Sequence, residues 1–86
     1  MPKLITCDGS VQPLPDASLD TLRNAVEGYI ETVPLGDGRY LVVNEDGRQL
    51  ELPHNIVATT LMHMAGHHPG NCIVGDAVLC ELGELQ

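Results

Sequence analysis

The spacing of apolar residues predicts a first helix in the N-terminal third of the chain. Leu19, Leu22 and Val26 recur at intervals of three and four residues, which places them on one side of a helix. Asp16 or Ser18 can cap the start of this helix by accepting a hydrogen bond from its first turn. A glycine follows the last apolar residue as a natural stop.

A second apolar stripe predicts a second helix in the C-terminal half. His54 or Asn55 stands at its start as the candidate cap, and Gly66 at its end. The stripe has the helical spacing expected of a face packed on the core. It consists of Ala58, Leu61, Met62 and Ala65.

Apolar runs bounded by turn residues predict the strands. Two turns, at residues 36–38 and 44–47, contain glycine and connect three runs into an antiparallel meander. Two prolines in residues 10–15 exclude a helix or a central strand there. A Gly-Asp pair bends the last run before its end. The predicted strands are residues 4–7, 29–35, 39–44, 48–52 and 72–80.

This order of elements predicts an α+β fold in a single domain of residues 1–86. The order is strand, helix, two or three strands, helix and strand. The simplest arrangement is a small, mostly antiparallel sheet with both helices on one face. The chain has no Trp or Phe, so its core is thin. Because self-association buries further apolar surface, we expect a homodimer or a larger homo-oligomer.

The charge of the chain limits its partners. Twelve carboxylates against four cations give a net charge of −8, and the basic surface that nucleic-acid binding requires is missing. We therefore expect no direct nucleic-acid contact, although an acidic surface can complement a basic protein. There is no long apolar run and no leader pattern, and the three cysteines form no even disulfide framework. We expect a cytoplasmic protein without membrane contact.

One cluster of residues could bind a metal. His63 and His67 stand four apart, followed by His68 and Cys72, and histidines at this spacing on a continuous helix can bind zinc. The helix is predicted to end at Gly66, so we favour surface histidines and expect no metal and no cofactor. No nucleophile elbow or phosphate loop occurs in the sequence. We therefore expect a protein that is not an enzyme, with a metal-dependent hydrolase as the weaker alternative.

The start of the second helix suggests a different site. This helix begins directly after a strand, and free backbone N–H groups at a helix N-terminus form an anion site. Each polar residue nearby also has an ordinary role as a cap or turn residue. Taken as a set, these residues predict a site for a small anionic or nucleotide-like ligand. The candidate ligand-binding residues are Arg39, Asn44, Arg48, Asn55 and Thr59.

Five short segments follow one another in a specific order. They are Gly28-Tyr29-Ile30-Glu31, Asp37-Gly38-Arg39, Val42-Val43-Asn44-Glu45-Asp46-Gly47, Leu52-Pro53-x-Asn55-x-x-Ala58-Thr59 and Ile73-Val74-Gly75-Asp76-Ala77-Val78-Leu79. Together they resemble a small domain family of unknown function that is common in phages, plasmids and other mobile elements. The resemblance covers roughly residues 26–80 and implies no activity. It implies that the chain is encoded alongside small accessory proteins of phages, which often blunt host defences by binding.

Two functions follow as expectations. The first is a phage-type counter-defence protein that sequesters a small phosphorylated or nucleotide-like defence signal in the host cytoplasm. The alternative is an acidic inhibitor, of the anti-restriction or anti-CRISPR kind, that binds a basic host nuclease or another nucleic-acid-processing protein. A ligand site favours the first, because the acidic residues are scattered along the chain.

Overall fold

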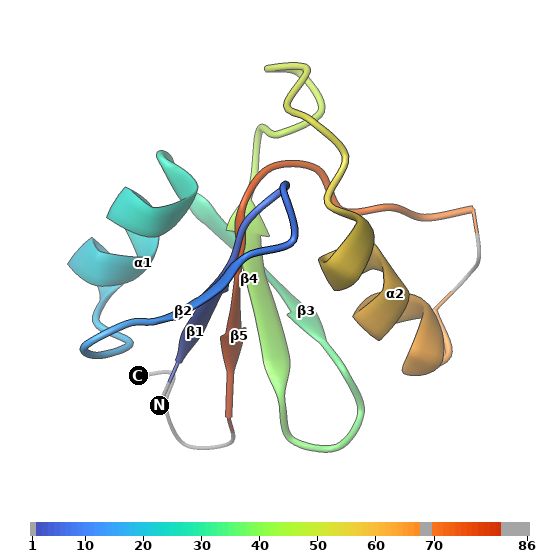
Figure 1. The fold of residues 1–86 in the computed structure, drawn as a ribbon, viewed down its shortest axis with the longest axis horizontal. Helices are drawn as coiled ribbons and strands as arrows, with labels where there is room; N and C mark the ends of the chain where they lie inside the picture. Colours follow the sequence, from blue (N-terminus) through green and yellow to red (C-terminus); the bar gives the residue numbers. More distant parts are fainter. Residues whose placement is uncertain (1, 68–69, 82–86) are drawn as a thin grey trace.

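The computed structural model describes residues 2–67 and 70–81, and it confirms the α+β class (Figure 1). Within these residues, five short strands form one sheet in the order β2-β1-β5-β4-β3. Each neighbouring pair in it is antiparallel. The elements are β1 (Lys3–Ile5), β2 (Val11–Pro13), α1 (Leu19–Val26), β3 (Ile30–Pro34), β4 (Tyr40–Asn44), α2 (Ile56–Met64) and β5 (Ala77–Cys80).

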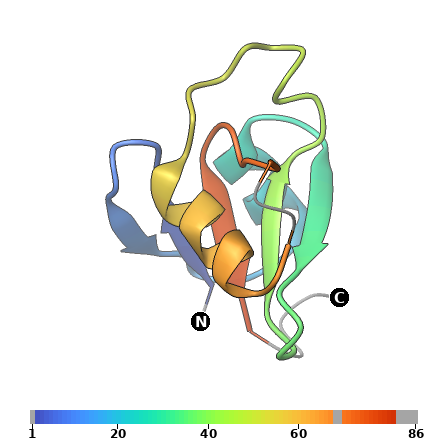
Figure 2. The same ribbon diagram turned by 90° about the vertical axis from the view of Figure 1, so that its right-hand side faces the viewer.

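The two helices cover opposite faces of the sheet, so the prediction that both lie on one face is wrong (Figures 1 and 2). On β4 and β5, Leu41 and Ala77 pack in the cluster that contains α2 residues. Their chain neighbours Val42 and Val78 pack in the cluster that contains α1 residues. Both strands are apolar at consecutive positions, and such strands need cover on each face. The sheet is therefore the middle layer of three.

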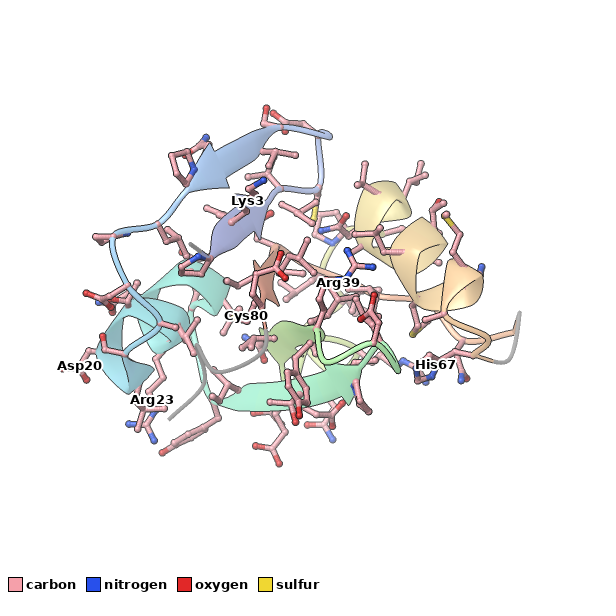
Figure 3. All side chains as sticks on the ribbon, turned by 90° about the horizontal axis from the view of Figure 1, so that it is seen from below. Lys3, Asp20, Arg23, Arg39, His67 and Cys80 are labelled. Carbon is pink, nitrogen blue, oxygen red and sulfur yellow. The ribbon has the colours of Figure 1, made fainter. Side chains whose placement is uncertain are left out.

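The α1 layer starts and ends close to its predicted positions. Ser18 is the N-cap, and its side chain accepts a hydrogen bond from the Thr21 N–H at 3.3 Å. Glu27 ends the helix in the left-handed conformation, with φ 61°. Leu22 and Val26 are buried as the stripe requires, whereas Leu19 is 49% exposed. Asp20 and Arg23 project from α1 on the side of the molecule away from α2 (Figure 3).

The α2 layer also follows the sequence pattern. Asn55 is the N-cap, and Gly66, with φ 94°, follows the last turn. Ala58 and Met62 are buried against the sheet, and the rest of the predicted stripe is partly buried beside them. With eight and nine residues, α1 and α2 are too short to cross a membrane, as holds for all helices in residues 2–67 and 70–81.

The predicted strand at residues 48–52 is wrong. These residues form successive turns, in which Leu50 N–H donates to the Asp46 carbonyl and Leu52 N–H to the Gly47 carbonyl. The physical reason lies in the sheet, because β4 already has β3 on one side and β5 on the other. No edge of β4 remains for a third partner.

The ends of the sheet accommodate the prolines. Pro13 lies on β2 and Pro34 on β3, and these are the two edge strands, where a missing N–H leaves no gap in a ladder. The last strand begins at Ala77 rather than at residue 72. Before it, Val74 makes a single bridge to His54, and Gly75 turns the chain with φ 79°.

Candidate functional site

Asn55 is a structural centre of the fold rather than a surface group. Its side chain is fully buried, and its Oδ1 accepts from the Ala58 N–H at 3.1 Å. Its Nδ2 donates to the carbonyls of Ile5 at 2.9 Å and Gly75 at 3.0 Å. One side chain thus joins α2, β1 and the turn before β5, and each of its polar atoms is satisfied within the chain.

Thr59 is also occupied by the protein itself. Its Oγ1 accepts from the Ile73 N–H at 2.8 Å and lies 3.4 Å from the Ile73 carbonyl oxygen. The His54 Nε2 lies 3.2 Å from the Thr59 Oγ1. Thr59 is buried. Its bonds to Ile73 attach α2 to the segment that leads to β5.

Asn44 closes the end of β4 on the α1 side. Its Nδ2 donates to the Val26 carbonyl at 2.9 Å, and its Oδ1 accepts from the Asp46 N–H at 2.8 Å. These bonds link the end of α1 to the turn after β4. Like Asn55 and Thr59, Asn44 is buried and acts in the fold.

The two candidate arginines do not meet. Arg39 precedes β4 and Arg48 follows it, so they lie beyond opposite ends of a strand about 17 Å long. Arg39 pairs with Asp37, with 2.8 Å between Nε and Oδ2. The hydrogen bond from the Arg39 backbone N–H, more than its guanidinium, holds the pKa of the Asp37 carboxyl below its ordinary value. The structure therefore does not bring the two candidate arginines together at one site.

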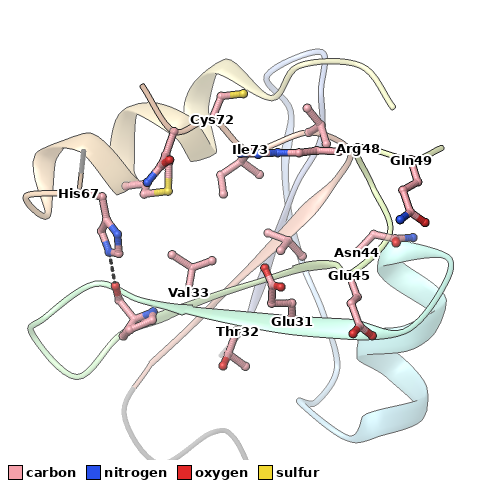
Figure 4. Close-up of a pocket in the computed structure, with 15 residues that line it drawn as sticks. Glu31, Thr32, Val33, Asn44, Glu45, Arg48, Gln49, His67, Cys72 and Ile73 are labelled. Atoms are coloured by element: carbon pink, nitrogen blue, oxygen red, sulfur yellow. Dashed lines mark hydrogen bonds between the residues drawn. The ribbon is translucent and has the colours of Figure 1, made fainter. Parts of the chain in front are cut away.

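A pocket lies elsewhere, between the sheet and the chain that leads to β5 (Figure 4). It is a groove of about 580 Å³. Its floor is the α2-facing side of β3 and β4, its opposite wall is residues 71–74, and the turn after β4 closes one end. Of the candidate residues, Asn44 and Arg48 line it, whereas Arg39, Asn55 and Thr59 do not.

The polar side chains of this groove come from three different segments. Arg48 extends along the wall toward Ile73, and Glu31 points up from β3 into the groove, as Figure 4 shows. At the far end, the His67 Nε2 lies 2.7 Å from the Pro34 carbonyl oxygen. Within residues 2–67 and 70–81, no ion pair engages Arg48. The groove therefore offers one cation opposite a carboxylate.

The predicted surface histidines are tied to the backbone. The His63 Nε2 lies 2.7 Å from the Asn71 carbonyl oxygen, and His67 bonds to Pro34. His68 lies outside the described residues. Among the residues that are described, no three metal-ligating side chains lie close enough to hold an ion.

Within the described residues, no disulfide joins any of the cysteines. Cys80 is fully buried in the α1-side cluster, and Cys72 lines the groove. Burial raises the pKa of the Cys7 thiol, and the Asp76 carboxylate beside it raises that pKa further. Cys7 is thus held in its protonated form, which is a poor nucleophile.

The model of a family described as a domain of unknown function (DUF3846) matches residues 2–85. The chain belongs to this family. The expected resemblance to a domain family of unknown function is thereby confirmed, and it extends over almost the whole chain. No curated protein and no solved structure matches the chain.

Position 28 requires glycine because the Asn44 side chain lies close to its Cα. A Cβ built on Gly28 would lie 2.7 Å from the Asn44 Nδ2, which the Val26 carbonyl already holds. We expect Gly28→Ala to lower the free energy of unfolding by about 1–3 kcal/mol, as overpacking does. Urea unfolding measures the loss. In an Asn44→Ala background the same substitution should cost little, and equal costs in both backgrounds would contradict this contact.

Sequence reasoning missed Glu31, Gln49 and His67 as residues of the groove. A signal for Glu31 was available, because it alternates with Val33 and so shares the α2-facing side of β3. A carboxylate on the inner side of a strand indicates either a partner or an open groove. Gln49 and His67 carried no such signal, since only the folded chain brings them to β3.

Proposed function

We propose that the chain is a non-catalytic binding protein that holds a small nucleotide-like ligand in the groove between β3–β4 and residues 71–74. The observation that carries the proposal is Arg48, which extends into a groove of about 580 Å³ without an ion-pair partner among the described residues. That volume lies in the range of small-molecule sites, which is about 300–1,000 Å³.

The groove lining favours a ligand with one anionic group. Arg48 supplies a planar, two-pronged donor for a phosphate or carboxylate. Glu31 accepts hydrogen bonds and suits the N–H groups of a base, and the apolar side chains of Val33, Val43 and Ile73 suit a flat ring. A triphosphate would meet Glu31 and Glu45 with a single opposing cation, so a nucleoside monophosphate is the better match.

The hydrogen bond between His67 and the Pro34 carbonyl favours a binding site over a catalytic site. His67, which lines the groove with Cys72, directs its Nε2 to the Pro34 carbonyl rather than to a thiol. In the phage or mobile-element setting that the sequence resemblance implies, a protein with such a groove would sequester a host defence signal. The free signal would fall below the level that activates its receptor.

Arg48→Ala tests this proposal. We expect it to raise the dissociation constant for a nucleoside 5′-monophosphate about 10- to 100-fold, because a hydrogen bond to a charged group contributes about 1.5–3 kcal/mol. Isothermal titration calorimetry with the four monophosphates, the nucleosides and inorganic phosphate gives the measurement. Arg39→Ala is the matched control, since Arg39 pairs with Asp37 outside the groove. Equal losses in both variants, or no binding by the unaltered chain, would refute the proposal.

The acidic inhibitor remains the second candidate because of one observation. Exposed carboxylates gather on the segment that carries β3, β4 and the turns around them. They are Glu27, Glu31, Asp37, Glu45, Asp46 and Glu51. If reversal of Glu45 and Asp46 to lysine abolishes counter-defence activity in cells while Arg48→Ala preserves it, the partner is a basic protein.

A further inference from the structure

One long segment of the chain contains no Asp, Glu, Lys or Arg. Residues 52–75 contain no Asp, Glu, Lys or Arg, although the whole chain carries twelve acidic and four basic residues. This segment forms α2 and the connection to β5. In Figure 3, charged side chains such as Asp20 and Arg23 project from α1, on the other side of the molecule. The α2 segment itself therefore contributes no Asp, Glu, Lys or Arg side chain to the surface of this acidic protein.

The solvent side of α2 is apolar, unlike that of an ordinary surface helix. Ile56 is 67% exposed and Met64 is 79% exposed, and Thr60 lies exposed between them. These three residues stand four apart, so they form one ridge along the helix. Val57, also exposed, widens this ridge. We call these four residues the α2 ridge.

The polar groups on and beside the α2 ridge already have partners inside the chain. The Thr60 hydroxyl donates to the Ile56 carbonyl at 2.8 Å. The His63 Nε2 lies 2.7 Å from the Asn71 carbonyl oxygen. Burial of the ridge against another surface would therefore leave neither side chain unsatisfied, and the usual penalty for covering polar groups is small.

We propose that the α2 ridge is the interface at which a second copy of this chain binds. The two α2 helices cross antiparallel on a twofold axis at Thr60, so that Ile56 of each copy contacts Met64 of the partner subunit. The ridge is self-complementary in this register, since the small residue lies between two large ones and lets the helices approach. Such contact of one patch with itself is the usual geometry of a homodimer.

The distribution of charge along the chain favours a second copy as the occupant of the α2 ridge. Two chains of net charge −8 repel each other, and a symmetric contact through a patch with carboxylates would place like charges together. The α2 ridge avoids this, because its segment has no carboxylate. The nine-residue helix is only about 13.5 Å long. The contact is thus smaller than a standard interface of roughly 800 Å² per partner, and we expect micromolar dissociation.

Sedimentation equilibrium tests the interface. Between about 1 µM and 1 mM, the mass should rise from that of the 9.2 kDa chain to twice that value. Met64→Glu should raise the dissociation constant at least about 100-fold, because each copy would bury a carboxylate in the contact. Leu19→Glu is the matched control, since Leu19 is 49% exposed on the opposite layer, and it should leave dimerisation unchanged. Circular dichroism shows that both variants fold.

Ionic strength separates this interface from a docking site for a basic protein. Added salt screens the repulsion between two acidic copies, so the dissociation constant of the dimer should fall between 20 mM and 300 mM salt. A chain that stays at 9.2 kDa up to 1 mM overturns the proposal and leaves a different protein as the occupant. A dimer that withstands Met64→Glu overturns it as well.

Discussion

Val42→Asp is expected to unfold the chain. Val42 is fully buried on β4, where it packs in the cluster that contains Leu22 and Val26 of α1. A carboxylate without a partner in such a place costs several kcal/mol, whether it stays charged or becomes protonated. We expect a loss of about 4–5 kcal/mol or more, against a total stability of roughly 5–15 kcal/mol for a typical domain. Thermal circular dichroism should show no cooperative transition.

The residue paired with Val42 on the neighbouring strand provides the control. Thr32 pairs with Val42 in the β3–β4 ladder and so lies on the same face, but its side chain is exposed. Thr32→Asp should change stability by no more than about 0.5 kcal/mol. Leu41→Asp, which alters the other face of β4, should unfold the chain as Val42→Asp does. If one of the two buried substitutions were tolerated, the corresponding face of the sheet would lack its helix.

Most of the elements could be predicted because the signals for them are local. The stripe of α2 and the turn glycines around β4 each lie within a few residues of the structure they specify. The placement of the helices depends on distant contacts, and there the prediction failed. The evidence for helices on opposite faces was nevertheless present in residues 40–43 and 77–80, where apolar residues follow one another without alternation. Strands of this pattern are buried on both faces.

The incorrect strand at residues 48–52 shows a different limit. Leu50 and Leu52 alternate with polar residues as strand residues do, yet Leu50 is 58% exposed. β5, which takes the free side of β4, comes about 30 residues later in the chain. A local pattern cannot reveal that a neighbour from far along the sequence already occupies the edge.

Of the five predicted ligand-binding residues, Asn44 and Arg48 line the groove, and the other three do not. Asn55 and Thr59 were recognised as polar residues at the start of α2, but a cap and a ligand-binding residue look the same in a sequence. The structure separates the two roles, because both side chains are buried and bonded within the chain. Arg48 remains a candidate, since it lines the groove.

Asn55→Ala is expected to be strongly destabilising without acting on ligand binding directly. It removes the cap of α2, which is worth about 1 kcal/mol. It also leaves the carbonyls of Ile5 and Gly75 without their donor, and a buried unsatisfied group costs about 1–3 kcal/mol. Allowing for relaxation, we expect a loss of about 3–5 kcal/mol in the free energy of unfolding. Urea unfolding measures it.

Comparison with two further variants separates the structural role of Asn55 from a role in binding. Asn24→Ala, at an exposed asparagine of α1, should change stability by no more than about 0.5 kcal/mol. Below its melting temperature, Asn55→Ala should bind a nucleoside monophosphate as the unaltered chain does, whereas Arg48→Ala should bind it weakly while melting normally. The opposite pattern, with Asn55→Ala stable but unable to bind, would move the ligand from the groove back to the N-terminus of α2. A free N–H group at that helix end would then be the anion donor, and the buried bonds of Asn55 would have to open for it.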